Sequence, residues 1–382
     1  MSDPRRLKLL SIAHPAVSSD GGRLRYYQMA ARDDVDVHLV IPAVWHEFGR
    51  TMVAAPSSDP RLTLHVLPIR LARAGPLSWY LHFYPGLGRL IRELQPDVIH
   101  LWEEPWGVVA LQARVLKGRA ALVMEVDQNI LKRLPPPFEW IRKQVLRNTD
   151  HVLSRSPDAT AVVRARGYLG PVSRIGYGVD LSNFHPGVEP AIPRTTWPDF
   201  RIGYVGRLVE EKGLDDALEA MMLTAMPVSL AIMGEGPYAE RLRQRVAELG
   251  LSDRVSFRGW GTPADVAAFL RSLDATVLLT RTTRSVREQF GRVIVESQAC
   301  GVPVIGSQSG AIPDVVGDGG WIVPERDPAA LAKQLDVIMS QPQSLQAHGF
   351  AAQSNVKNRF TYGAVADDLL AACMAAVQSR NA

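Results

Sequence analysis

Short apolar runs rich in β-branched residues alternate with amphipathic stretches along almost the whole chain. In the first half, six such runs predict strands, and several of the stretches between them have helical spacing. The predicted strands are 7–13, 35–41, 62–69, 97–102, 120–126 and 151–154, and the predicted helices include 23–32, 77–93 and 138–147. This alternation favours βαβ units and a parallel sheet.

The alternation stops over residues 188–198 and then restarts. Prolines occupy this stretch without any apolar periodicity, and proline removes backbone donors, so we interpret it as a linker. The strands predicted after it are 201–205, 228–233, 255–257, 275–279, 303–305 and 321–323. We therefore expect an α/β protein with two doubly wound, Rossmann-like halves, residues 1–187 and 199–361, whose strand ends face a central cleft. A last helix, about 362–379, could pack on either half.

Composition narrows the class of protein without selecting a function. The 382 residues are 46% hydrophobic and 21% charged, which excludes long disorder, collagen-like repeats and a coiled-coil rod. The net charge of +4 permits anionic partners, but no basic stripe or known module indicates nucleic-acid binding. Two cysteines cannot form a disulfide framework, so we expect a reducing, cytoplasmic location. No apolar run reaches the roughly 18 residues of a membrane span, and Lys8 interrupts the first run, which we interpret as a buried strand rather than a signal peptide.

The strongest chemical signal follows the predicted strand 201–205. Arg207 and Lys212 lie between this strand and the start of the next helix. The first N–H groups of a helix are free and its dipole favours anions, so this is a suitable place for a phosphate. Arg207 offers a forked donor and Lys212 a point charge. The alternative is two surface cations paired with Glu210 and Glu211.

A second signal is a pair of carboxylates eight residues apart, Glu288 and Glu296. One lies in a loop and the other in the following helix, so both can reach one ligand. Carboxylates accept hydrogen bonds from neighbouring hydroxyls, which suits a sugar or a ribose. Gly291 lets the backbone approach a ligand, and the free N–H groups near Val293 could reach a phosphate. The alternative is a capped helix start with one solvated glutamate, but it leaves Phe290 and Gly291 between the acids unexplained.

Two weaker signals involve glycines at strand ends. Residues 234–239 match the G-x-G-x-x-A dinucleotide fingerprint, but Arg258 stands where an acidic residue is expected. An arginine there suggests a 2′-phosphate, so an NADP-type oxidoreductase is one alternative function, and a tight turn is the plainer explanation. In the first half, Gly21 and Gly22 follow the first strand, where a Gly-Gly turn lets the backbone approach a ligand. A plain loop explains them almost as well.

Taken together, these motifs resemble glycosyltransferase family 4, a large group of retaining sugar transferases with the GT-B fold. The matching stretches are 206–208, 211–213, 233–237, 257–259, 288–296, 299–305, 309–314 and 319–324 in the second half, and 21–22, 96–100 and 177–180 in the first. Any one of them is weak, whereas the ordered set is specific.

The resemblance implies a retaining hexosyltransferase that uses a UDP- or GDP-sugar and needs no metal or other cofactor. Arg207 and Lys212 would hold the pyrophosphate, Glu288 would contact the donor sugar and Glu296 the ribose. The donor-binding set it implies is Gly21, Gly22, Arg207, Lys212, Gly234, Arg258, Glu288, Phe290, Gly291, Val293 and Glu296, and the catalytic set is Glu288, Arg207, Lys212 and Asp127. It also implies that the last helix, 362–382, lies with the first half.

The first half departs from the family pattern at one position. Many members carry a histidine near the anomeric carbon, just after a first-half strand, where this chain has Asp127 or Gln128. Glu103 or Glu104 could take the acceptor's proton, although a solvated loop explains them equally well.

The acceptor side is otherwise poorly defined by the sequence. The acceptor could be a sugar, a lipid-linked molecule or another small molecule. Arg70, Arg73 and the aromatic stretch 77–84 could touch a membrane surface, but a core-packed helix is the explanation that we favour. A catalytically silent protein that binds a sugar or nucleotide remains a further alternative.

Overall fold

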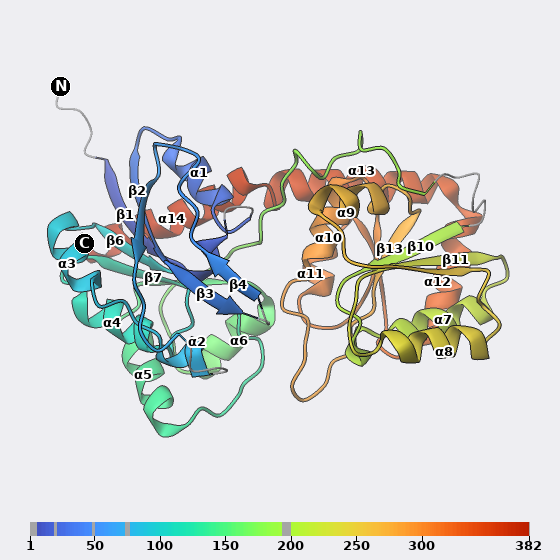
Figure 1. Cartoon of the computed structure of the whole chain (residues 1–382), viewed down its shortest axis with the longest axis horizontal. Coiled ribbons are helices and arrows are strands. Elements are labelled where there is room, and N and C mark those ends of the chain that lie inside the picture. The colour runs from blue at the N-terminus through green and yellow to red at the C-terminus, as the bar shows by residue number, and fades with distance from the viewer. Residues whose placement is uncertain (1–5, 19–20, 48–49, 73–76, 193–199, 382) are drawn as a thin grey trace. The chain divides into compact units, whose positions relative to one another are not determined.

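The computed structural model describes residues 6–381 except 19–20, 48–49, 73–76 and 193–199 (Figure 1). The chain divides into two compact units, Met1–Gly178 with Tyr362–Ala382, and Val179–Thr361. Residues 179–187 belong to the second unit, because Val179 pairs with Thr361 and its N–H donates to the carbonyl of Phe360 (2.8 Å). The predicted end of the first half at residue 187 is therefore wrong. Most of the expected linker, 193–198, lies outside the described residues.

The described part of the first unit contains a seven-stranded parallel sheet in the order β5-β2-β1-β6-β7-β8-β9. Its strands are β1 (Leu7–Ile12), β2 (Val35–Pro42), β5 (Thr63–Leu67), β6 (Val98–Leu101), β7 (Ala121–Val126), β8 (His151–Ser154) and β9 (Val172–Arg174). The central strands are mostly apolar because helices cover both faces, and polar residues within them such as His100 of β6 and Glu125 of β7 are buried. The six predicted strands are confirmed, whereas β9 and a hairpin of β3 (Val44–Glu47) and β4 (Arg50–Val53) were not foreseen.

Two sets of helices cover this sheet. Helices α1 (Leu24–Ala30) and α14 (Tyr362–Asn381) share one apolar cluster with it, and α3 (Leu87–Leu94), α4 (Val108–Leu116) and α5 (Pro136–Leu146) share another. Helix α6 (Pro157–Ala165) follows β8. The single helix predicted over 77–93 is wrong. It is split into α2 (Ser78–Leu81) and α3, because Pro85 lies between them and lacks an N–H donor.

The second unit contains, in its described part, a six-stranded parallel sheet in the order β12-β11-β10-β13-β14-β15. Its strands are β10 (Phe200–Val205), β11 (Val228–Met233), β12 (Val255–Arg258), β13 (Ala275–Leu278), β14 (Val304–Ser307) and β15 (Gly320–Val323), as predicted to within two residues at each end. Its helices are α7 (Leu214–Leu223), α8 (Ala239–Glu248), α9 (Pro263–Leu270), α10 (Arg292–Ala299), α11 (Ile312–Val316), α12 (Pro328–Ser340) and α13 (Pro342–Arg359) (Figure 1).

The strand order of each sheet reverses at one point. In the first unit this point lies between β1 and β6, and in the second between β10 and β13. Open parallel sheets bind ligands outside the carboxyl ends of the strands at such points. The candidate residues should therefore be sought just after these four strands.

Three smaller expectations concern the location of the protein. The first apolar run forms the buried strand β1, as predicted. Cys300 and Cys373 are both buried and free. Among the described residues, no helix combines the length and apolar character that crossing a membrane requires.

Candidate functional site

The glycines at the ends of β10 and β11 hold two turns of the second unit against each other. Gly234 has a φ of 144°, and a Cβ atom there would lie 2.0 Å from the carbonyl oxygen of Gly206. Its N–H donates to the carbonyl of Arg258 (2.9 Å), and the N–H of Gly206 donates to that of Met233 (3.0 Å). Close packing therefore accounts for the glycine pattern without a dinucleotide.

Lys212 and Glu288 meet at the point where the strand order of this sheet reverses. Lys212 ends the short 3₁₀ turn Glu210–Lys212 after β10, and its Nζ donates to Oε2 of Glu288 at 2.6 Å. Thr280, just after β13, donates its hydroxyl to the same oxygen (2.8 Å). An ammonium group has three donors, so Lys212 keeps capacity for an anion. The pairing of Lys212 with its sequence neighbours Glu210 and Glu211 is not what the structure shows.

Arg207 extends from the end of β10 into solvent. The residue is exposed, and among the described residues its guanidinium makes no hydrogen bond or ion pair. Its carbonyl is fixed instead, because the hydroxyl of Tyr204 donates to it (2.9 Å). A held backbone with an unpaired cationic side chain leaves all the guanidinium donors available to a ligand. Arg258 and Trp260, at the end of β12, are exposed as well.

The start of helix α10 brings the other predicted donor residues together. Gly291 adopts a left-handed conformation (φ 81°) as the residue before the helix, and the first N–H groups of the helix lack intrahelical acceptors. Val293 lies in this first turn with its side chain buried. The ring of Phe290 packs edge-on against Phe360 (5.5 Å between centroids), so the ring is a packing element of the second unit.

Glu296 lies one turn further along α10. Burial raises the pKa of its carboxyl group. The described part of the chain offers this carboxyl no hydrogen bond, although Arg292 lies near enough to lower the pKa slightly. A half-buried carboxyl without a hydrogen-bond partner gains free energy when ligand hydroxyls donate to it. This is the chemistry expected of a residue that holds a ribose.

In the first unit, Asp127 follows β7 and is held by two neighbours. Arg155 donates from Nε to Oδ1 (2.9 Å), and the hydroxyl of Tyr177 donates to Oδ2 (3.2 Å). Arg155 also pairs with the fully buried Glu125, on whose other oxygen Arg25 donates at 2.5 Å. The two guanidinium groups outweigh the effect of burial and hold the pKa of Glu125 far below its usual range. Asp127 is thus an anchored carboxylate whose side chain is 27% exposed.

Sequence reasoning missed a histidine–glutamate pair where the strand order of the first sheet reverses. His14 follows β1 and Glu103 follows β6, and His14 Nδ1 lies 2.7 Å from Oε1 of Glu103. His82 Nε2 lies 3.7 Å from the same oxygen. Burial would raise the pKa of Glu103, but the two histidines lower it to about 2. The sequence alone could not predict this contact, because it depends on β1 and β6 being neighbours in the sheet.

His14, His82 and Glu103 are also the one set in the described ranges that could hold a metal ion, with ligand atoms within 4.8 Å of one another. Two ligands of a tetrahedral zinc ion, bound at about 2.0–2.1 Å, lie about 3.3 Å apart. The separation of 2.7 Å between His14 and Glu103 is shorter than this and is an ordinary hydrogen-bond length. The set therefore fits a hydrogen-bonded pair better than a metal site.

The remaining first-half predictions fall partly on packed and partly on exposed positions. A Cβ atom on Gly22 would lie 2.4 Å from the carbonyl oxygen of Pro15, so this glycine permits close packing of the loop, and Gly21 beside it is half-buried. In the stretch 77–84, His82 and Tyr84 are buried, whereas Trp79 is 45% exposed. Arg73 lies outside the described residues.

Two family models match the chain. Residues 194–354 match glycosyl transferases group 1, and residues 25–183 match glycosyltransferase family 4. The D-inositol 3-phosphate glycosyltransferase of Segniliparus rotundus is 32% identical over 53% of this chain and 46% of its own length. The putative colanic acid biosynthesis glycosyltransferase WcaL of Salmonella typhimurium is 31% identical over 60% and 58%. The chain thus spans about half the length of these two relatives. A D-inositol 3-phosphate glycosyltransferase of Streptomyces bingchenggensis is 28% identical over 91% and 85%.

Solved structures agree on the fold. Anabaena HepE in complex with UDP has a TM-score of 0.69 at 18% identity, covering 96% of this chain and 99% of that one. The sucrose-phosphate synthase of Thermosynechococcus elongatus has a TM-score of 0.68 at 22% identity, covering 96% and 98%. The comparisons give no support to a dinucleotide-dependent oxidoreductase. Two family models that together match most of the chain, and two Rossmann-like units of the GT-B fold, show that this protein belongs to glycosyltransferase family 4.

Proposed function

We propose that this protein is a glycosyltransferase that moves a sugar from a nucleotide-diphosphate sugar to an acceptor hydroxyl. The observation that carries the proposal is the Lys212–Glu288 pair (2.6 Å), which lies at the reversal point of the second sheet, where the exposed Arg207 follows β10. Cations and carboxylates so arranged suit a ligand that carries both a diphosphate and sugar hydroxyls. HepE, a fold relative, was crystallised with UDP, and a relative from Corynebacterium glutamicum is named a GDP-mannose-dependent alpha-mannosyltransferase.

The charges that develop during transfer explain the roles of these residues. When the bond between sugar and phosphate breaks, positive charge grows on the anomeric carbon and negative charge on the leaving diphosphate. Arg207, Lys212 and the first N–H groups of α10 would stabilise the diphosphate, with Lys212 and the helix N–H groups held in place before the ligand binds. Glu288 would accept hydrogen bonds from the sugar hydroxyls, and Glu296 from the ribose.

On the acceptor side, the proposal includes the anchored carboxylate of Asp127. Asp127 follows β7, in the region where the resemblance implies a histidine in many family members and where Gln128 is the other candidate, and Arg155 with Tyr177 fixes the direction of the Asp127 carboxylate. We expect transfer with retention of the anomeric configuration, as the family resemblance implies, and NMR coupling constants of the product check this. The acceptor would be a sugar, a lipid-linked molecule or another small molecule. A cytoplasmic location, with peripheral membrane contact through the exposed Trp79, is part of the same proposal.

A thermal-shift screen over UDP-, GDP- and ADP-sugars tests the proposed donor class. A ligand present at 100 times its dissociation constant stabilises the folded state by about 2.7 kcal/mol. One nucleotide series should therefore raise the melting temperature, and the matching sugar should then be transferred or slowly hydrolysed. Binding without transfer or hydrolysis would favour the catalytically silent alternative, and no shift with any series would contradict the proposal.

We expect that removal of metal ions leaves the transfer rate unchanged. The side-chain cations of Arg207 and Lys212 supply the charge that a metal would otherwise place on the diphosphate. The measurement is the initial rate before and after dialysis against EDTA, with the metal content of the dialysed protein checked by mass spectrometry. A rate that falls tenfold and returns with added Mg²⁺ or Mn²⁺ would show that the site depends on a metal.

A further inference from the structure

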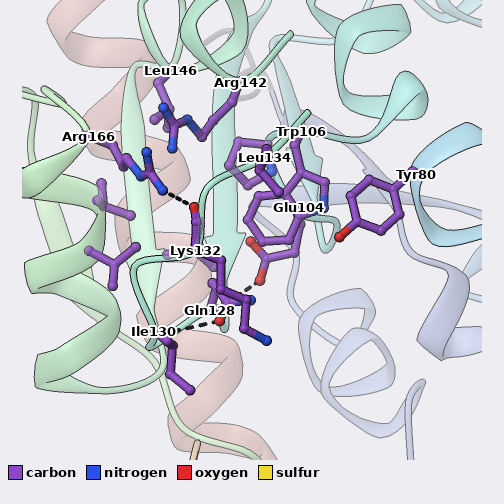
Figure 2. Close-up of a pocket in the computed structure, with 14 residues that line it drawn as sticks. Tyr80, Glu104, Trp106, Gln128, Ile130, Lys132, Leu134, Arg142, Leu146 and Arg166 are labelled. Carbon is purple, nitrogen blue, oxygen red and sulfur yellow. Dashed lines mark hydrogen bonds between the residues drawn. The ribbon is translucent and has the colours of Figure 1, made fainter. Parts of the chain in front are cut away.

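A cavity in the first unit lies at the carboxyl ends of β6 and β7, and among the residues that line it are two candidates named above, Glu104 and Gln128 (Figure 2). It encloses about 70 Å³ of space open to water-sized molecules, which is room for several of them. Its wall is mainly apolar and aromatic, with Tyr80 from α2, Trp106 from the loop after β6 and Val162 from α6. A cavity of this composition prefers an apolar body to bulk water.

Two buried polar atoms of lining residues have no partner among the described residues. One is Oε2 of Glu104, and the other is Nε of Arg142, a residue that is only 4% exposed. The second oxygen of Glu104 is occupied, because the N–H groups of Asp127 and Gln128 donate to it (2.9 Å each). Buried polar groups are almost always hydrogen-bonded. An occupant that accepts from Arg142 and from a protonated Glu104 would satisfy both.

The cavity also carries an excess of positive charge. Lys132, Arg142 and Arg166 line it, and the last two share the single carboxylate of Glu139, which Arg166 reaches at 3.6 Å. Figure 2 shows the guanidinium groups of Arg142 and Arg166 together on one side of the cavity. Of the nearby carboxylates, only that of Glu139 pairs with the lining cations, because Asp127 pairs with Arg155 and Glu103 with His14, and this excess of positive charge favours a ligand with a negative charge.

Glu104 does not cancel this excess at neutral pH. Burial and the nearby carboxylates of Asp127 and Glu103 raise its pKa to about 8, although the two N–H groups that donate to it work in the opposite direction. Below that pH the group is mostly a neutral acid and can donate a hydrogen bond. Above it, the carboxylate repels an anion.

From the cavity, its unpartnered donor and its charge, we infer a binding site for a small amphiphilic anion. Such a ligand has an apolar body of about the size of one ring and a single carboxylate or phosphate. The body lies against Tyr80, Trp106 and Val162, and the anionic group lies between Arg142 and Glu104. This inference concerns the first unit alone and does not depend on the proposed sugar transfer.

The test is calorimetry of the full-length protein with three probes of one shape, benzoate, benzyl alcohol and benzylamine, at pH 6.5. We expect benzoate to bind at least tenfold more tightly than benzyl alcohol, and benzylamine not to bind. Phenyl phosphate should bind as benzoate does. Equal affinity for the three probes, or no binding of benzoate and phenyl phosphate, would overturn the inference.

Variants distinguish the loss of ligand binding at this site from a general loss of the folded state. Arg142→Leu should weaken benzoate binding about tenfold or more, since a hydrogen bond to a charged group is lost, while Glu139 keeps Arg166 as partner. Lys143→Leu removes one charge from the exposed face of the same helix and should change nothing. If Arg142→Leu does not fold, Val162→Phe fills the cavity from its partly exposed rim and should abolish binding. Unchanged affinity in Val162→Phe would contradict the site.

The pH profile gives an independent readout of Glu104. Benzoate stays ionised between pH 6.5 and 9, so its affinity should fall as the pH rises through about 8, where Glu104 loses its proton. Glu104→Gln keeps a neutral donor at this position and should bind benzoate with no such fall. A profile that is identical in the two proteins would show that Glu104 does not face the ligand.

Discussion

Replacing Arg207 with alanine should lower kcat for sugar transfer by a factor of 10² to 10³ while leaving the fold intact. Removing one preorganised donor from a developing anion raises the barrier by about 2.7–4 kcal/mol. Arg207 is exposed and, in the described part of the chain, has no side-chain partner, so its truncation leaves no buried group unsatisfied. The substitution should therefore weaken almost only the stabilisation of the leaving diphosphate, and not the folded state.

The measurement is steady-state transfer by Arg207→Ala, with the melting temperature recorded in parallel. Lys333→Ala is the matched control, because it removes one positive charge from an exposed position on α12 in the same unit. The control should retain full activity. If Arg207→Ala also stays within twofold of the natural protein, Arg207 does not hold the leaving group.

The largest effect on stability is expected for Glu125→Gln. Glu125 lies between Arg25 and Arg155, and all three side chains are almost completely buried. Removing one partner of a buried ion pair leaves an uncompensated charge and costs about 3–5 kcal/mol. Here the amide would leave Arg25 without an anionic partner and Arg155 with Asp127 alone. A loss of this size is a large part of the total stability of a typical domain.

Urea denaturation followed by circular dichroism measures this loss. Glu93→Gln is the control, since Glu93 is a carboxylate of the same unit whose side chain is 60% exposed in a surface pair with Arg89. The control should unfold as the natural protein does. A change below about 1 kcal/mol in Glu125→Gln would mean that the buried network is not an ion-pair network.

The strands were predictable because the buried strands of a parallel sheet are nearly continuous apolar runs, which single polar residues such as Glu125 interrupt here without hiding the pattern. β8 and β11 match their predicted bounds residue for residue. Prediction failed where a single residue interrupts the hydrophobic pattern, or where the strand is too short to show one. Pro85 divides the amphipathic stretch 77–93 into two helices, and β9 is a three-residue edge strand whose pattern is too short to detect.

The donor-side residues were predictable one by one, whereas their partners were not. Motif spacing pointed to Lys212 and Glu288 separately, but their pairing joins residues 76 positions apart. His14 and Glu103 are 89 residues apart and meet only because β1 and β6 are neighbours in the sheet. The pattern of one chain segment contains no information on strand order, so contacts of this kind require the fold.

The central claim is that the carboxyl edge of the second sheet holds the diphosphate of an activated sugar. Hydrogen exchange of the full-length protein, with and without the nucleotide sugar chosen by the thermal-shift screen, tests it directly. The account predicts slower exchange in Gly206–Gly213 and in Gly291–Glu296 when the nucleotide sugar is bound. Protection confined to the first unit, with both of these segments exchanging as in the free protein, would contradict it.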